Sequence, residues 1–374
     1  MSINKLSFLS RLILVLIFVY LFLVSIGLMG AAFNGFGKGF AEGLIRTTSN
    51  PFIGLFIGIL ATSIVQSSST ITSIVVGMVG SGVINVSNAI PIIMGANIGT
   101  TITGAIVSLG HFSRREEFKR AIIGGTVGDF FKVMCVCILF PLELTFGLLS
   151  KASALMSNIF ANVGGIKFTS PIKSATKPVV HLIEDITLRL VTPHNAGYIA
   201  LLLISIIILF ISLYFIVRLM KALVAKRAEI VLSNIIGRHG VLAIFAALIF
   251  TAIIQSSSIT IALMIPLIAA GVLNVETMLP LIMGANIGTT ITAILASFAT
   301  GNIAAITVAF SHFLFNMIGV CCFYPIKALR NIPIVCANSL GELAFKKRRY
   351  AILFILTFFF IVPGLLVLFS RLLK

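Results

Sequence analysis

Two short polar motifs of this chain could bind an ion, because each brings several hydrogen-bonding side chains into an apolar stretch. QSSST occupies residues 66–70, and QSSSI occupies residues 255–259. Their hydroxyl and amide groups can donate hydrogen bonds to an anion, and their oxygens are hard ligands that suit Na⁺ better than a soft metal. One such motif in a membrane helix is more typical of helix packing. Two copies in one chain favour a binding site.

A second motif follows each QSSS motif at the same distance. IMGANIGTTIT occupies residues 93–103 and recurs without a change at 282–292. Aligning the two QSSS motifs brings both copies into register without a gap, and after a shift of five residues Phe131 aligns with Phe315. Self-similarity over this length indicates an internal duplication, so the chain consists of two related halves.

The composition places these motifs in a membrane protein. Hydrophobic residues make up 59% of the 374 positions and charged residues only 10%, with a mean hydropathy of +1.17, which excludes a soluble globular surface. The apolar runs 12–33, 198–217 and 350–370 reach the roughly 20 residues that a spanning helix needs. The first run is too long for a signal peptide and has no small-residue cleavage site, so we expect a retained anchor helix.

The net charge of +17 indicates an orientation in the membrane rather than nucleic-acid binding. The basic residues lie in short loops between apolar runs, as the positive-inside rule expects of cytoplasmic loops. The N-terminus is then cytoplasmic. The segment 164–197 is also basic but is predicted outside, because long translocated loops follow the rule poorly; a basic external vestibule there could attract an anion. The predicted cytoplasmic clusters are Arg114, Arg115, Lys119 and Arg120; Arg218, Lys221, Lys226, Arg227 and Arg238; and Lys327, Arg330 and 346–349.

The apolar runs that flank each QSSS motif are too short to cross a bilayer. Residues 52–65 precede the first motif and 71–84 follow it, and 241–254 and 260–273 flank the second. Runs of about 10–14 residues are typical of re-entrant segments. We therefore expect each QSSS motif to form the tip of a re-entrant helical hairpin.

The IMGANIGTTIT motifs have a different expected role. Their glycines and polar side chains interrupt the longer runs 89–110 and 278–298, which predicts two discontinuous transmembrane helices. Interrupted backbone at membrane depth must be satisfied by protein or line a water-filled cavity, so the four motifs should meet in one polar cavity. Free N–H groups at helix ends favour an anion there, and free carbonyl groups favour a small cation. An anion and a cation in one site are typical of a coupled carrier.

The loop charges predict that the two halves are inverted repeats. The loop 114–120 after the first pair of motifs is basic, whereas the equivalent loop 299–302 has no basic residue. In inverted repeats the binding site lies near the midplane of the membrane. The predicted fold class is therefore an all-α polytopic membrane protein of two inverted repeats, each with a re-entrant hairpin and a discontinuous helix. The predicted boundaries are 1–163 for the first repeat with its anchor helix, 164–197 for an extracytoplasmic loop, 198–345 for the second repeat and 346–374 for a C-terminal transmembrane helix.

The remaining reactive residues argue against an enzyme. The five histidines have no metal-ligand spacing, and the five cysteines are odd in number and lie in or beside apolar runs, which favours packing over disulfides. The membrane-depth motifs hold no cluster of histidines or carboxylates for nucleophilic or acid–base chemistry. We expect no catalytic residue, no cofactor and no bound metal other than transported Na⁺.

At this point the motifs resemble a known family. QSSST, PIIMGANIGTTIT, the stretch SRREEFKRAIIGGTVGDFFKVMCVCILFPLE at 113–143, and the second-half QSSS, MGANIGTTIT and SHFLFN (311–316) are similar to the type II sodium–phosphate cotransporters. The resemblance implies Na⁺-driven uptake of inorganic phosphate by alternating access. Without the long tail of the animal carriers, the chain resembles a bacterial member, which implies the bacterial cytoplasmic membrane. A Na⁺-independent phosphate exporter or channel on the same scaffold stays open, as do a monomer and a homodimer.

Matching positions carry the family's binding residues over to this chain. The division of the polar residues between the two ions stays open beyond the serines. The resemblance implies phosphate contacts from Ser67, Ser68, Ser69, Ser256, Ser257, Ser258 and Thr292. It implies sodium-site roles for Gln66, Gln255, Asn97, Asn286, Thr100, Thr289 and Asp129.

One position departs from the family pattern. Asp129 matches an acidic residue that accompanies electrogenic transport in the family, but Lys132 stands where the family has Asn, and Gly128 stands where it has His. The second half keeps the amide at Asn316. On a helix, Asp129 and Lys132 face the same side. Two interpretations follow: the Lys132 ammonium partly substitutes for a sodium ion, or the two residues form a structural salt bridge near a helix end.

Overall fold

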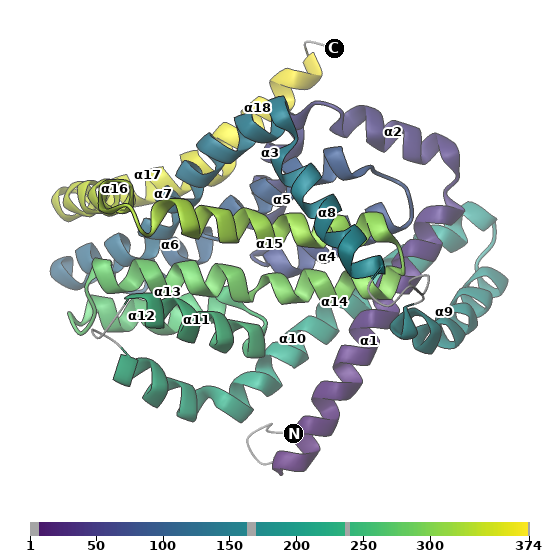
Figure 1. The fold of residues 1–374 in the computed structure, drawn as a ribbon, viewed down its shortest axis with the longest axis horizontal. Coiled ribbons are helices and arrows are strands. Elements are labelled where there is room, and N and C mark those ends of the chain that lie inside the picture. The colour runs from purple at the N-terminus through teal and green to yellow at the C-terminus, as the bar shows by residue number, and fades with distance from the viewer. Residues whose placement is uncertain (1–6, 163–169, 236–239, 373–374) are drawn as a thin grey trace.

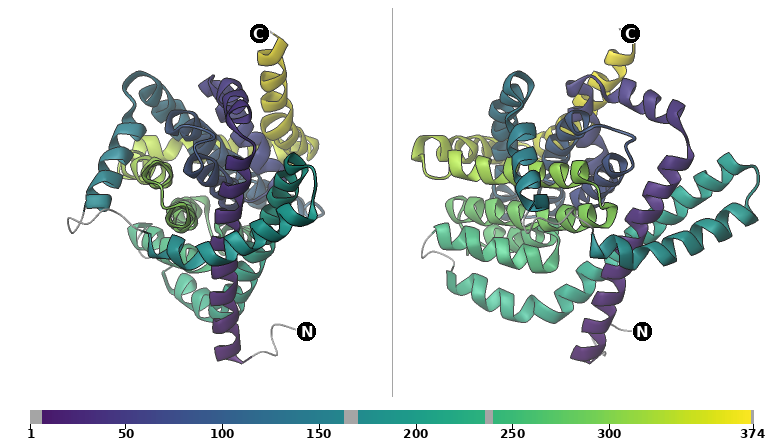
Figure 2. Two further views of the ribbon diagram at one scale, coloured as in Figure 1. Left: turned by 90° about the vertical axis from the view of Figure 1, so that its right-hand side faces the viewer. Right: turned by 45° about the vertical axis from the view of Figure 1, so that its right-hand side comes forward.

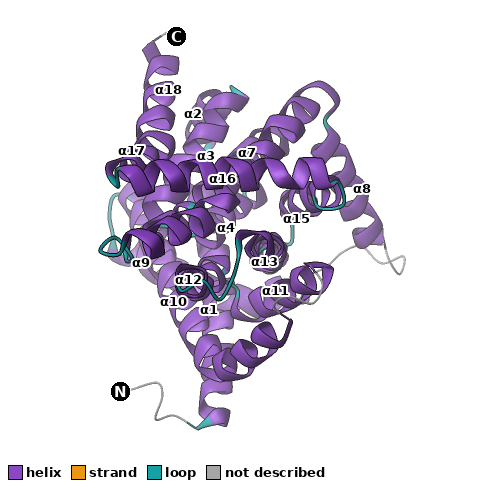
Figure 3. Ribbon diagram, turned by 90° about the vertical axis from the view of Figure 1, so that its left-hand side faces the viewer, coloured by secondary structure: helices purple, strands orange, loops and turns teal. Residues whose placement is uncertain are grey.

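The computed structural model describes residues 7–162, 170–235 and 240–372, and every regular element in these ranges is helical (Figures 1 and 3). This confirms the predicted all-α class. The helices are α1 (Phe8–Gly35), α2 (Lys38–Thr48), α3 (Pro51–Val65), α4 (Ser68–Gly80), α5 (Val86–Gly99), α6 (Ile102–Leu109), α7 (Arg115–Phe146), α8 (Leu148–Asn162), α9 (Pro171–Leu190), α10 (His194–Ile235), α11 (Gly240–Ile254), α12 (Ser257–Ala269), α13 (Val275–Gly288), α14 (Thr290–Thr300), α15 (Ile303–Phe323), α16 (Lys327–Lys346), α17 (Arg349–Leu356), the π-helical turn η2 (Thr357–Ile361) and α18 (Val362–Leu372).

Seven helices or helix pairs of the described ranges are long and apolar enough to cross a membrane, which makes this a multi-pass membrane protein. Three of them contain the apolar runs predicted from the sequence. Two others are the end-to-end pairs α5–α6 and α13–α14, and Figure 1 shows α15 running alongside the second pair. The seven spans are Phe8–Gly35, Val86–Leu109, Arg115–Phe146, Asn195–Leu223, Val275–Thr300, Ile303–Phe323 and Arg349–Ser370.

The two halves repeat the same arrangement of helices. In the first half α3 and α4 form a hairpin, and α3 packs along α5; in the second half α11 and α12 form a hairpin, and α11 packs along α13. Even the helix starts correspond. The Asn85 side chain caps α5 by accepting from the Asn88 N–H (2.8 Å), and Asn274 caps α13 by accepting from the Thr277 N–H (2.9 Å). The internal duplication is therefore a structural one.

Glycines of the second motif allow the close packing between hairpin and span. A Cβ at Gly95 would lie well inside van der Waals contact of the Leu55 carbonyl oxygen, and one at Gly284 would meet the equivalent Ile244 carbonyl in the same way. Both glycines lie inside regular helices. Their role is close approach between helices, and the interruption of the span lies further along.

The interruption is milder than the sequence suggests. It is confined to Thr100 and Thr101 between α5 and α6, and to Thr289 between α13 and α14. There the Thr101 N–H donates to Ile98 (3.1 Å) and the Thr292 N–H to Thr289 (3.3 Å), so i→i−3 bonds replace i→i−4 bonds for one turn. The sequence predicts broken helices with free backbone N–H and C=O groups at these positions. The structure instead shows one tighter turn in which the backbone hydrogen bonds are kept.

The segment between the halves contains a helix instead of the loop expected for 164–197. α9 covers Pro171–Leu190 and packs against α1 and α10, and Figure 2 shows α1 crossing this α9–α10 pair. Pro171 at the first helical position and the Ser170 hydroxyl, which accepts from the Lys173 N–H (3.3 Å), start the helix. Residues 163–169 lie outside the described ranges. The placement of this segment on the outer side of the membrane stays a prediction.

The glycine packing yields a stability prediction. Gly284→Ala should lower the free energy of unfolding by roughly 1–3 kcal/mol or more, because its Cβ would force α11 away from α13. Gly30→Ala in α1 is the matched control, since a Cβ there meets no atom within 4 Å. Thermal unfolding of the purified variants in detergent measures both. Equal thermal unfolding midpoints for Gly284→Ala and Gly30→Ala would contradict the close approach of α11 to α13.

Candidate functional site

The two QSSS tips have the same backbone conformation. Gln66 follows α3 with φ of 56°, and Gln255 follows α11 with φ of 59°. No other non-glycine residue in the described ranges has a positive φ. For a residue other than glycine, the left-handed backbone conformation costs of order 1–3 kcal/mol. It persists only where the surrounding structure enforces it. Its occurrence at both equivalent tips marks them as specified features of the fold.

The first serine of each motif starts the second helix of its hairpin. The Ser67 hydroxyl accepts from the Thr70 N–H (3.2 Å), and the Ser256 hydroxyl accepts from the Ile259 N–H (3.3 Å). These are N-caps, and they satisfy one of the four N–H groups that a helix start leaves without an intrahelical acceptor. The positive ends of α4 and α12 therefore lie directly at the QSSS motifs.

The third serine of each motif contacts the other half of the chain. The Ser69 hydroxyl lies 3.3 Å from the Thr289 hydroxyl and 3.5 Å from the Gln255 carbonyl oxygen. The Ser258 hydroxyl lies 3.4 Å from the Thr103 hydroxyl. The four motifs, far apart in the sequence, therefore meet at one place. The expectation that hairpin tips and spans come together is met for these residues.

A cavity of about 380 Å³ lies between the two tips. One wall consists of both QSSS motifs and Thr289, and the facing wall belongs to α10. The predicted site residues that line it are Gln66, Ser67, Ser68, Ser69, Gln255, Ser256, Ser257, Ser258 and Thr289. The α10 residues that line it are Phe210, Leu213, Tyr214, Val217, Arg218 and Lys221.

Arg218 and Lys221 also line the cavity, although the sequence pattern predicts a basic loop at both positions. α10 continues without interruption through them and exposes both side chains at the cavity. The Arg218 guanidinium donates to the Tyr214 hydroxyl (2.9 Å), which holds it along the same helix face. Their spacing of four and three residues from Tyr214 onward places all three side chains on one helix face, and this sequence signal could have identified them. With two helix N-termini opposite, the cavity combines hydrogen-bond donors with positive charge and suits an anion.

A second polar cluster lies away from this cavity, deep among α5, α7 and α15. Lys132 is only 1% exposed, and its ammonium donates to the Asn97 side-chain oxygen (3.0 Å) and to that of Asn316. The ammonium also lies 5.3 Å from the Phe315 ring centroid. No salt bridge joins it to Asp129, so the structural salt bridge considered above is wrong.

The Asp129 carboxylate is buried without a donor. It is 1% exposed, and neither oxygen accepts a hydrogen bond from the described residues. Thr101 lies beside it, but the Thr101 hydroxyl donates its proton to the Ile98 carbonyl (2.7 Å). A buried carboxylate left this way is costly unless a proton or a cation joins it. The two carboxylate oxygens are therefore free to accept a proton or to bind a cation.

The other predicted site residues are buried outside the cavity. The Thr100 hydroxyl donates to the Ala96 carbonyl (2.8 Å), as expected of a threonine within a tightened turn. The Asn286 side-chain nitrogen and the Thr292 hydroxyl have no partner among the described residues. The structure therefore separates the predicted residues into a cavity-lining set and a deeper set of oxygen-bearing side chains.

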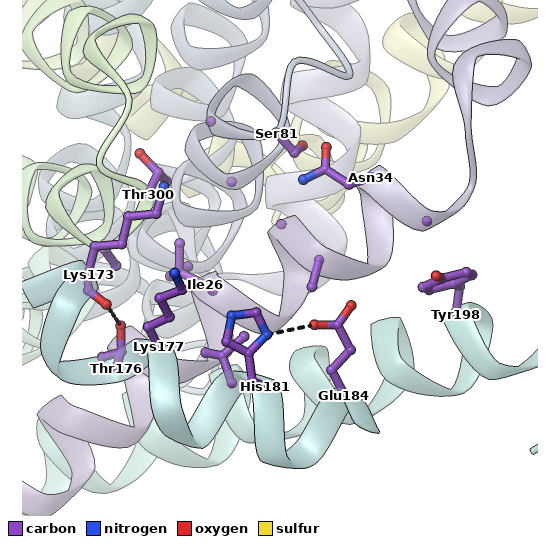
Figure 4. Close-up of a pocket in the computed structure, with 18 residues that line it drawn as sticks. Ile26, Asn34, Ser81, Lys173, Thr176, Lys177, His181, Glu184, Tyr198 and Thr300 are labelled. Atoms are coloured by element: carbon purple, nitrogen blue, oxygen red, sulfur yellow. Dashed lines mark hydrogen bonds and ion pairs between the residues drawn. The ribbon is translucent and has the colours of Figure 1, made fainter. Parts of the chain in front are cut away.

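A larger cavity, of about 560 Å³, lies at the far ends of α4 and α14 (Figure 4). Lys173, Lys177 and His181 of α9 line one side, and Asn34 and Thr300 line the opposite side. The His181 Nδ1 lies 3.5 Å from a Glu184 carboxylate oxygen. Between the two cavities α4 and α14 pack closely together along their length.

Comparison with known proteins shows clear relatives. The sequence model described as Na⁺/Pi-cotransporter matches residues 21–158 and 208–324. Sodium-dependent phosphate transport protein 2B of Homo sapiens is 33% identical over 95% of this chain and 64% of its own length. Sodium-dependent phosphate transport protein 2A of Rattus norvegicus is 32% identical over 94% of this chain and 66% of its own length. The chain thus spans slightly less than two thirds of the length of these relatives. No solved structure matches it significantly.

The contact between the halves yields a cross-linking prediction. In a variant without the native cysteines, Ser69→Cys with Thr289→Cys should form a disulfide on oxidation, because the two side-chain oxygens lie 3.3 Å apart. A protease site placed between the halves makes the cross-link visible, since the fragments then stay joined until reduced.

Ser81→Cys with Thr289→Cys is the matched control pair. Ser81 lies at the other end of α4, about 18 Å further along at 1.5 Å per residue. It should form no disulfide. If the two fragments of the Ser69→Cys/Thr289→Cys variant separate without a reducing agent, the contact between Ser69 and Thr289 is contradicted.

Proposed function

Because this chain belongs to the Na⁺/Pi-cotransporter family, we propose that it couples Na⁺ entry to the uptake of inorganic phosphate. One observation carries the proposal: two helix N-termini with serine hydroxyls face a single cavity that Arg218 and Lys221 also line. The relatives' names, sodium-dependent phosphate transport proteins, agree with this chemistry. A transporter of this kind needs no catalytic residue and no cofactor, since Na⁺ and phosphate are its substrates.

The phosphate site that we propose lies in the cavity between the QSSS tips. Phosphate oxygens accept hydrogen bonds, and the serine hydroxyls together with the first-turn N–H groups of α4 and α12 are donors. We assign Ser67–Ser69 and Ser256–Ser258 to it. Thr292 lies behind the cavity wall, one helical turn beyond Thr289, and its hydroxyl has no partner among the described residues, so we add it to this set.

The sodium sites that we propose use the deeper oxygen-bearing residues. Asp129 supplies a buried carboxylate whose oxygens have no donor, and Na⁺ prefers such hard oxygen ligands. Amide and hydroxyl oxygens of other predicted site residues complete the ligand set that we propose. We assign to these sites Asp129, Asn286, Thr100 and Thr289, with Gln66 and Gln255 at the cavity. Asn97 belongs to a further cation position, where its side-chain oxygen accepts from Lys132.

We further propose that the halves are inverted repeats with re-entrant hairpins. The helices α3, α4, α11 and α12 have 13 or 15 residues, so they rise about 20 Å, less than the roughly 30 Å of a bilayer core. The end of α4 is bound by Asn302, which donates to the Gly80 carbonyl (3.0 Å). The end of α12 is bound by Arg120, which donates to the Ala269 carbonyl (2.8 Å). Asn302 belongs to the loop without basic residues, whereas Arg120 lies in the basic first turns of α7, so the hairpins enter from opposite sides.

This topology implies alternating access through the two cavities. Arg218 and Lys221 lie near the cytoplasmic end of α10, so the QSSS cavity faces the cytoplasm. The cavity lined by Lys173 and Lys177 lies on the outer side, beyond the closely packed ends of α4 and α14. We infer an inward-facing conformation in the cytoplasmic membrane. The bacterial source implied by the resemblance stays a prediction.

Transport by the purified protein tests the function. In proteoliposomes, labelled phosphate should accumulate when an inward Na⁺ gradient is imposed, because Na⁺ entry supplies the driving force. The same vesicles with K⁺ or choline in place of Na⁺ are the controls. Equal uptake with all three cations would favour the Na⁺-independent exporter or channel, and no phosphate flux under any gradient would exclude phosphate as the substrate.

The basic residues of the cavity yield a binding prediction. Arg218→Gln and Lys221→Gln should each weaken phosphate binding to the purified protein about 1.5- to 5-fold, because exposed charges contribute about 0.2–1 kcal/mol. The loss should shrink in about 1 M salt, where the screening length falls to about 3 Å. Lys151→Gln, an exposed charge on α8, is the control. Affinities unchanged at low salt would remove these residues from the site.

A further inference from the structure

We propose that the Lys132 ammonium occupies a cation position of the transport site, so that this chain binds one Na⁺ fewer than the same scaffold would with an amide at that position. The inference rests on the proposed function. It concerns which residue acts as a cation, and it adds Lys132 to the residues that set the number of ions per phosphate.

The surroundings of the ammonium are those of a cation site. Its two acceptors, the side-chain oxygens of Asn97 and Asn316, belong to different helices and converge on the one nitrogen. The Phe315 ring lies 5.3 Å away and adds the negative face of its π system. These ligands are neutral oxygens from amides, the kind that also bind Na⁺. The ammonium thus takes the place that a metal ion would take among the same oxygens.

The two amide oxygens are oriented by the hydrogen bonds of their own side-chain nitrogens. The Asn97 side-chain nitrogen donates to the Ile93 carbonyl (2.9 Å), and that of Asn316 donates to the His312 carbonyl (2.8 Å) and to the Asn97 oxygen (3.2 Å). With the nitrogens held in this way, both oxygens turn toward the same point. Both residues are at most 4% exposed, so bulk water does not replace the ammonium as a partner.

The internal duplication shows what this position holds in the other half. Phe131 aligns with Phe315, and therefore Lys132 aligns with Asn316. One repeat thus has an amide at the position where the other has an ammonium, and the two side chains contact each other. An amide at both positions would leave three amide oxygens around a space large enough for an ion, since asparagine is shorter than lysine.

Lys132 does not act as the partner of the nearest acid. Asp129 lies one turn earlier on α7, yet the two side chains form no salt bridge, and the Asp129 oxygens accept no hydrogen bond from the part of the chain that the structure describes. The carboxylate is therefore left for a mobile cation, while the ammonium is held by neutral ligands. This arrangement separates one fixed positive charge from one exchangeable one.

Lys132→Asn tests the inference in proteoliposomes. We expect the charge moved per phosphate, measured from reversal potentials, to rise by about one elementary charge, and the Hill coefficient for Na⁺ to rise with it. Lys132→Met is the matched control: it removes the ammonium at similar length but supplies no oxygen, so it should reduce transport without raising the ratio. An unchanged ratio in Lys132→Asn, with the native protein showing Na⁺-driven uptake, overturns the inference and leaves the proposed function intact.

A second measurement uses the native protein and does not depend on the folding of a variant. Crystals grown in Tl⁺, which replaces Na⁺ and scatters anomalously, should show no Tl⁺ bound to the Asn97 and Asn316 side-chain oxygens. A Tl⁺ ion bound between those two oxygens would overturn the inference. Native vesicles without any Na⁺-dependent uptake would instead overturn the proposed function itself.

Discussion

The rest of the structure depends on the close packing of each short hairpin helix against a glycine-bearing span. Helices of 15 residues cannot cross a bilayer by themselves, so α3 and α11 must be held by their neighbours. Gly95 and Gly284 let backbone carbonyls approach where any side chain would intrude. In a lipid environment such contact is the main source of helix association, since apolar burial gives no advantage over lipid. This contact brings the left-handed turns at Gln66 and Gln255 to one shared cavity.

The polar groups brought to that depth fall into two sets with opposite chemistry. Around the cavity lie donors: hydroxyls, helix N-termini and the cationic side chains of α10. Behind it lie acceptors, with the Asp129 carboxylate and the amide oxygens of Asn97 and Asn316. An anion in the cavity and cations behind it would attract each other strongly, because they would lie close together in a medium of low dielectric constant. That division supports the coupled transport that we propose.

Much of this arrangement was predictable from the sequence, and the errors have physical causes. Hydropathy and the exact repeat predicted the spans and the duplication, because length and pattern are local properties. The glycines were interpreted as helix breaks, yet Gly95 and Gly284 lie in regular helix, and the turn tightens at Thr100 and Thr289. Arg218 and Lys221 were assigned to a loop because a one-dimensional pattern does not show that α10 passes beside both tips.

The sequence by itself determined the membrane class, the duplication, the QSSS tips and the departure at Lys132, since composition and repetition are readable without coordinates. Only the tertiary structure decided which residues share a space. It joined Ser69 to Thr289 across the halves, gave Lys132 two amide oxygens from different helices, and left Asp129 without a donor. Residues far apart in the chain meet only when helices pack, and packing is set by surfaces that no single segment contains.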